Sequence, residues 1–241
     1  MRRAILADIH GNLEAFEAVM RDIAERGGVD ELWCLGDVVG YGPEPSACIA
    51  LLRRHPHICV AGNHDWAAIG KLDTADFNPD AAAACKWTAG QLSAEDVAYL
   101  RHLDLTATCG EFTLVHGSPR DPLFEYVTSP RRATANLQFF GTRFCLVGHT
   151  HVPAVFTDAD GKCYWSELPP VLSLVTGRII LNLGSVGQPR DKDPRAAYAI
   201  YDEAERLIYS YRVPYDIEVT QKKMIEYGLP ESLSLRLSDG W

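Results

Sequence analysis

Short apolar runs alternate with helical patterns along the first quarter of the chain. Residues 4–7, 32–35 and 58–61 are apolar runs of strand length, and polar or glycine-rich turns break each of them. Apolar residues recur at helical spacing over 13–23, and a second helical pattern covers 45–54. Strands that alternate with helices predict an α/β fold, with a parallel or mixed sheet covered on both faces.

The segment 66–108 has a different character, because helical patterns replace the strand-like runs. The patterns cover 79–91 and 93–103, and Ser93 and Asp96 have the spacing of a capping box at the start of the second. We interpret this segment as a helical insertion beside the sheet ends. It is a candidate lid that selects the substrate.

Strand-like runs return after the insertion and continue almost to the end of the chain. They cover 112–115, 144–147, 179–183, 196–201 and 207–213, with a hairpin turn expected at 158–161 and a final helix at 217–227. The sequence contains no repeat, low-complexity run or linker. We therefore expect one domain over 1–241.

Composition and charge restrict the partners that this chain can have. Apolar residues make up 47% and charged residues 23%, which is typical of a globular protein. The formal net charge of -9 repels nucleic-acid backbones and anionic membranes, so we expect neither as a partner. The same charge repels a phosphate substrate. A phosphate site here needs local positive charge, and bound metal ions supply it most directly.

The cysteines and the hydropathy favour a reducing, aqueous compartment. The seven cysteines are odd in number, and their spacing matches neither a disulfide framework nor a zinc ribbon, so we expect free thiols. The apolar run at the N-terminus is too short for a signal peptide. No stretch approaches the roughly 20 apolar residues of a membrane span. The expected location is the cytoplasm.

Potential metal ligands follow five of the apolar runs. They are Asp8 and His10, Asp37, Asn63 and His64, His116, and His149 and His151. Because ligands of open α/β sheets lie outside the carboxyl ends of the strands, these side chains are expected to converge. Imidazole and carboxylate without thiolate favour a pair of first-row divalent ions over calcium and over a closed structural zinc site.

Five short blocks occur in a fixed order between residues 5 and 152. They are Asp8-x-His10, Gly36-Asp37, Gly62-Asn63-His64-Asp65, His116 and Gly148-His149-x-His151. In this order they resemble the blocks of the calcineurin-like metallophosphoesterases. The resemblance implies two stacked mixed β-sheets flanked by helices, a four-layer αββα sandwich. It also implies hydrolysis of a small phosphate ester by attack of a metal-bound hydroxide.

The resemblance further assigns a role to each candidate ligand. One ion would be held by Asp8, His10 and His151, the other by Asn63, His116 and His149, and both by Asp37. Manganese is the expected metal, and iron, zinc, cobalt and nickel are alternatives. His64 would donate a proton or hydrogen bond to the leaving-group oxygen, and Asp65 would orient its imidazole.

Two further residues are candidates for substrate binding. Arg190 follows a glycine-rich turn over 184–187 and has the fork geometry that suits phosphate, although it could instead be a surface arginine paired with Asp191 and Asp193. Tyr41 follows the Asp37 turn and either lines the pocket or packs. A second candidate group is an aromatic wall for an organic substituent, for which core packing is the alternative: Phe77, Trp87 and Tyr126.

A narrower resemblance concerns the segments 34–43, 116–119 and 182–190. They resemble small prokaryotic phosphodiesterases of the YfcE/MJ0912-like and diadenosine-tetraphosphatase-like kind, although Leu183 stands where that subgroup usually has proline. Asp65 stands where protein serine/threonine phosphatases have glutamate, which counts against that activity.

We therefore expect a phosphodiesterase or phosphatase that acts on a small-molecule phosphate ester. The alternatives are a dinucleoside-polyphosphate hydrolase and a non-catalytic interaction scaffold of the same fold. A nuclease is disfavoured because the net charge is negative. Exposed edge strands would allow a homo-oligomer.

Overall fold

Two six-stranded mixed sheets form the centre of the protein. The computed structural model describes residues 1–175 and 177–241. The first sheet has, in spatial order, β3 (His57–Cys59), β2 (Glu31–Cys34), β1 (Arg2–Leu6), β11 (Ala196–Asp202), β12 (Leu207–Val213) and β9 (Val171–Ser173). The second has β4 (Thr106–Cys109), β5 (Phe112–Val115), β6 (Phe144–Val147), β10 (Ile179–Asn182), β7 (Ala154–Ala159) and β8 (Lys162–Ser166).

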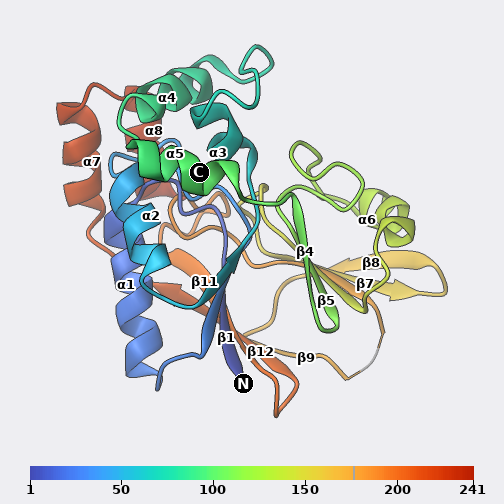
Figure 1. The fold of residues 1–241 in the computed structure, drawn as a ribbon. Helices are drawn as coiled ribbons and strands as arrows, with labels where there is room; N and C mark the ends of the chain where they lie inside the picture. The colour runs from blue at the N-terminus through green and yellow to red at the C-terminus, as the bar shows by residue number, and fades with distance from the viewer. Residues whose placement is uncertain (176) are drawn as a thin grey trace.

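Helices cover the outer faces of both sheets. Next to the first sheet lie α1 (Leu13–Glu25) and α2 (Pro45–Arg53), while α7 (Ile217–Glu226) packs against α1 and α8 (Glu231–Asp239) packs against α7. The chain next forms α3 (Asn63–Ala68), and then α4 (Pro79–Ala89) and α5 (Ala94–Arg101), which lie within the predicted insertion. On the second sheet lie α6 (Pro130–Asn136) and the 3-10 helix η1 (Leu137–Phe139). Figure 1 shows α1, α2 and α7 on one side of the molecule and α6 on the other.

Alternation of side chains along the strands produces the layers. In β1, Ala4 and Leu6 pack into a cluster with α1, whereas Ile5 packs into the cluster between the two sheets. In the second sheet, Leu146 faces this same central cluster, and Cys145 faces α6. The result is four layers, helix, sheet, sheet and helix, as the resemblance implied.

Most predicted elements are present, and the exceptions have local causes. The helix predicted at 217–227 is α7, and it ends before Gly228, which adopts a positive φ of 70° and is followed by Pro230. The predicted hairpin turn joins β7 to β8, with positive φ at Asp160 and Gly161. The sequence analysis missed the short strands β4 and β9, the helices α3, α6 and α8, and the 3-10 helix η1. Among the described residues, no helix is long and apolar enough to cross a membrane.

Candidate metal centre

The loops after five strands bring the predicted ligands to one edge of the sandwich. β1 and β2 are parallel, as are β5 and β6 and also β6 and β10, so their carboxyl ends point the same way. The loops that follow carry the predicted set, and every member is buried: Asp8, His10, Asp37, Asn63, His116, His149 and His151. The structure thus brings together all seven side chains, and the ions they would hold stay a prediction.

Backbone strain is concentrated at this edge. Five candidate ligands have a left-handed conformation, with φ of 54°, 51°, 52°, 66° and 58° at Asp8, His10, Asp37, His149 and His151 respectively. A non-glycine residue in this region costs on the order of 1–3 kcal/mol. Five such residues at one place are not explained by stability of the fold. Their strained backbone instead directs the five side chains toward the same edge of the sandwich.

The first ligand group consists of Asp8, His10 and His151, whose ligand atoms lie within 4.8 Å of one another. Nδ1 of His10 is 3.1 Å from the carbonyl of Val39, and Nδ1 of His151 is 2.6 Å from the carbonyl of Gln188. A carbonyl can only accept, so both Nδ1 atoms carry the ring proton. The two Nε2 atoms are 3.1 Å apart, so in neutral rings their lone pairs face each other, which favours a cation between them.

The second ligand group consists of Asp37, His116 and His149, again within 4.8 Å. Nδ1 of His116 donates to the carbonyl of Leu35 at 2.9 Å, which fixes the tautomer of a neutral ring. Its Nε2 lies 3.1 Å from both Asn63 Oδ1 and His149 Nδ1. Asn63 therefore joins this group through its amide oxygen.

Asp37 lies between the two groups. Its Oδ2 is 3.6 Å from His10 Nε2 and 3.3 Å from His116 Nε2. Asp37 Oδ2 and Asp8 Oδ2 are buried and have no hydrogen-bond partner among the described residues. Buried polar atoms without partners are costly unless something else satisfies them. Cations held by the two ligand groups would satisfy both oxygens.

The electrostatics also fit cations at these positions. Burial raises the pKa of Asp8 to about 7 and lowers the pKa of His149 to about 3, so the imidazole remains neutral and able to coordinate. Burial alone would lower the pKa of His116, but the Asp37 carboxylate outweighs it and raises that pKa to about 9, so without an ion this ring carries a positive charge at the place where an ion would bind. Burial is the largest reason that the pKa values of His10 and His151 lie well below the usual range for histidine. The donors present are those that divalent transition metals prefer.

Asp65 has a different role from the one expected. The prediction that it orients the His64 imidazole is wrong, because both of its oxygens accept from backbone N–H groups. Oδ2 accepts from Asp37 at 2.8 Å and from Gly62 at 2.9 Å, and Oδ1 accepts from Val39 at 3.2 Å. Asp65 therefore fixes the turns that carry Asp37 and Asn63. Nδ1 of His64 instead lies 3.2 Å from Sγ of Cys85, which the sequence analysis missed.

A pocket of about 160 Å³ opens beside the second ligand group and His64. Its lining includes residues of the predicted insertion: Asp76, Phe77, Asn78 and Ala81. Tyr126 stacks on His149 with ring centroids 3.9 Å apart, and Phe77 lies 5.3 Å from His64. Phe124, which was not predicted, completes this aromatic wall. Trp87 is outside it, because that ring stacks on Tyr227.

Arg190 supplies positive charge next to the candidate ligands. Its Nη2 donates to Gln188 at 2.8 Å, its Nε has no partner among the described residues, and its Cζ is 5.7 Å from the Tyr41 ring. The alternative of a surface ion pair is wrong: Asp191 pairs with Arg212, and Asp193 pairs with Arg195.

Tyr41 both packs and lines the pocket. Its ring is 4.6 Å from that of His10 and 4.3 Å from that of His64, and it also belongs to a cluster with residues of α8. The side chain is 6% exposed. The two roles considered for Tyr41 are therefore not alternatives.

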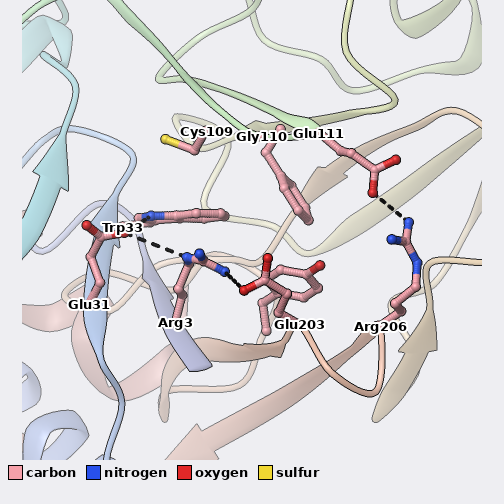
Figure 2. Close-up of a pocket in the computed structure, with 10 residues that line it drawn as sticks. Arg3, Glu31, Trp33, Cys109, Gly110, Glu111, Glu203 and Arg206 are labelled. Carbon is pink, nitrogen blue, oxygen red and sulfur yellow. Dashed lines mark hydrogen bonds and ion pairs between the residues drawn. The ribbon is translucent and has the colours of Figure 1, made fainter. Parts of the chain in front are cut away.

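A second pocket, of about 250 Å³, lies at the amino ends of the strands and has a different chemistry (Figure 2). Figure 2 shows Arg3 between Glu31 and Glu203, and Arg206 next to Glu111. Its lining holds three glutamates and two arginines, and all five of these side chains are in ion pairs, so the pocket offers a phosphate group no unpaired positive charge. The metal-binding chemistry is at the opposite edge.

The four-layer sandwich and its strand-end histidines and carboxylates define the class of the protein, an α/β protein of the metallophosphoesterase type. The chain belongs to the calcineurin-like phosphoesterase superfamily, whose domain model matches residues 1–206. The uncharacterised protein MJ0912 of Methanocaldococcus jannaschii is 36% identical over 245 residues, which covers 97% of this chain and 96% of that protein.

Of two further relatives, a solved structure matches the whole chain, whereas an enzyme matches only part of it. The crystal structure of a metallophosphoesterase from Sphaerobacter thermophilus superposes with a TM-score of 0.90 at 46% identity, covering 100% of this chain and 99% of that one. A symmetrical bis(5'-nucleosyl)-tetraphosphatase of Pseudomonas putida is 32% identical over 79 residues, 30% of this chain and 27% of that enzyme.

Proposed function

We propose that the protein hydrolyses a small organic phosphate diester with the help of two divalent metal ions. The observation that carries this proposal is the pair of ligand groups that meet at Asp37, next to a pocket that His64 lines together with Asn63 and His149. Two ions bound there would acidify a water molecule at neutral pH and neutralise phosphoryl oxygens. Asp8, His10 and His151 would hold one ion, Asn63, His116 and His149 the other, and Asp37 both.

Arg190, which lies near the candidate ligands, and the residues that line the pocket would supply binding and positioning. Arg190 is the fixed positive charge that a chain of net charge -9 needs in order to attract a phosphate group. His64, which lines the pocket, would donate a hydrogen bond to the leaving-group oxygen. Phe77, Phe124 and Tyr126 give one wall an apolar character that suits an organic substituent.

The proposal is tested with metal-stripped protein to which manganese is returned. Hydrolysis of bis(p-nitrophenyl) phosphate and of p-nitrophenyl phosphate is followed for the wild type and for His64→Ala. We expect diester turnover that requires manganese and falls on the order of tenfold in the variant, because p-nitrophenolate is a good leaving group and needs only limited help from His64. Turnover of the monoester alone would identify a phosphatase. Two bound ions without turnover of either substrate would favour a non-catalytic scaffold.

A dinucleoside polyphosphate is the second candidate substrate. It is favoured by the partial similarity to the Pseudomonas putida tetraphosphatase and by the aromatic wall, on which a nucleobase could stack. Incubation with diadenosine tetraphosphate and chromatography of the nucleotide products tests it. Symmetrical cleavage to two equal products supports this candidate, and intact substrate beside active diester hydrolysis contradicts it.

A further inference from the structure

Neighbouring residues cover the edge of the His64 imidazole that carries Nδ1. Its Nδ1 lies 3.2 Å from Sγ of Cys85 on α4, and Cys85 is 1% exposed. A Cβ added at Gly40 would lie 2.6 Å from the same nitrogen, so the backbone of Gly40 covers it from the other side. Since Nδ1 is enclosed and the side chain lines the pocket, Nε2 is the ring nitrogen left to meet a substrate.

The thiol of Cys85 has the protonation state of a hydrogen-bond donor. Burial, followed by the neighbouring carboxylates of Asp37 and Asp65, raises its pKa to about 12, so the proton stays on sulfur at neutral pH. A thiol is a weak donor, and a neutral imidazole nitrogen without a proton is its natural acceptor. If Nδ1 accepts from the thiol, the single ring proton of neutral His64 must be on Nε2.

We propose that Cys85 is the positioning residue of His64: its thiol donates to Nδ1 and so holds the ring proton on Nε2, facing the leaving-group oxygen. This inference rests on the proposed function. It gives Cys85 the role that the sequence analysis gave to Asp65, whose oxygens are occupied by backbone donors. Cys85 touches the imidazole and acts only through it. The hydrogen bond from Nε2 stabilises the oxygen as the P–O bond breaks, and no proton has to leave the ring.

The strength of the effect depends on the leaving group. p-Nitrophenolate is a stable anion and gains little from a hydrogen bond, whereas phenolate is more basic and gains more. Loss of the Cys85 thiol should therefore slow methyl phenyl phosphate more than methyl p-nitrophenyl phosphate. It should act on kcat, because the contact orients a group that works in the transition state.

The first test compares kcat for these two diesters in the manganese-loaded full-length chain. We expect Cys85→Ala to lower kcat on the order of tenfold for methyl phenyl phosphate, with a clearly smaller loss for the nitrophenyl ester. Cys85→Ser, which keeps a donor, should recover part of this loss. Cys48→Ala, which removes a buried thiol from α2, is the matched control and should change neither rate. Equal losses on both esters, or no loss, would overturn the proposal.

The second test reads the His64 tautomer without any turnover. Nitrogen-15 NMR of the histidine-labelled, zinc-loaded chain is compared with His64→Gln to assign the ring signals. We expect a proton on Nε2 of His64 in the wild type and a mixture of tautomers in Cys85→Ala. A proton on Nδ1 in the wild type would refute the proposal. If the wild type hydrolyses no ester, the proposed function fails, and this spectrum still decides the role of Cys85.

Discussion

The carboxylate of Asp65 accepts the backbone N–H of Asp37 at 2.8 Å, so a side chain from one strand-end turn fixes the backbone of another. Asp37 has a positive φ of 52° and points its carboxylate between the two ligand groups. The strained conformation of Asp37 thus depends on a buried contact made 28 residues further along the chain.

Replacing Asp65 by asparagine should weaken the metal centre. The amide group keeps one acceptor and turns an NH2 group toward a backbone N–H, so one buried donor loses its partner. We expect the free energy of unfolding to fall by about 1–3 kcal/mol and the manganese affinity to fall on the order of tenfold or more. Urea denaturation and calorimetric titration measure the two quantities. Asp239→Asn, on an exposed residue of α8, is the control, and equal affinities for both variants would contradict this role.

Position 62 has room only for glycine, because Asp37 fills the space that a side chain would occupy. A Cβ at this position would lie 2.0 Å from Asp37 Oδ1 and 2.4 Å from its backbone nitrogen, although the φ of -97° suits any residue. We expect Gly62→Ala to destabilise the protein by about 1–3 kcal/mol and to reduce metal binding, because Asp37 has to move. Gly141→Ala, where the added Cβ meets nothing within 4 Å, should stay within about 0.5 kcal/mol. Thermal denaturation compares them, and similar losses would argue against the steric explanation.

Arg190 should contribute to substrate binding. Arg190→Gln removes a charge that no carboxylate neutralises within the described part of the chain. A hydrogen bond to a charged group is worth about 1.5–3 kcal/mol, so KM for the diester should rise on the order of tenfold or more. Steady-state kinetics measures this rise. Arg195→Gln, which removes a surface arginine paired with Asp193, should leave KM unchanged. An unchanged KM in Arg190→Gln would show that the phosphate group of the substrate does not bind at Arg190.

The contact of α7 with α1 should weaken in acid. Lys223 donates to Glu14 and, at 2.5 Å, to Glu44. Burial alone would raise the pKa of Glu14, but the hydrogen bond from Lys223 outweighs it and holds the pKa below its usual 4.5. The folded pKa is therefore lower than the unfolded pKa. The stabilisation is present above pH 4.5 and is lost as the pH falls through the folded pKa.

Lys223→Met removes this pH dependence. We expect the variant to be less stable than the wild type by on the order of 1 kcal/mol at pH 7, with a difference that shrinks as the pH falls below 4.5. Urea denaturation at several pH values measures the difference. Lys222→Met is the adjacent control, because the side chain of Lys222 is 79% exposed. A difference that is constant with pH would show that the contact is not electrostatic.

The sequence was sufficient to predict the candidate metal ligands, but not the contacts of the residues that hold the site in position. Asp8 and His116 each come just after a buried apolar strand, so periodicity and residue type were sufficient to identify them. Cys85 is one of seven cysteines, and nothing in the sequence of α4 indicates that its thiol meets an imidazole 21 residues away. The role of Asp65 was assigned from its position next to His64 in the sequence, whereas its partners are set by how the turns fold.

The central claim is that the strand-end residues hold two metal ions on either side of Asp37. The most direct measurement is the metal content of the protein after loading with manganese and removal of free ions, by plasma mass spectrometry, for the wild type and for Asp37→Asn. The account predicts about two ions per wild-type chain and at most about one in the variant, because the shared carboxylate is lost. One ion or fewer in the wild type, or two retained by Asp37→Asn, would contradict it.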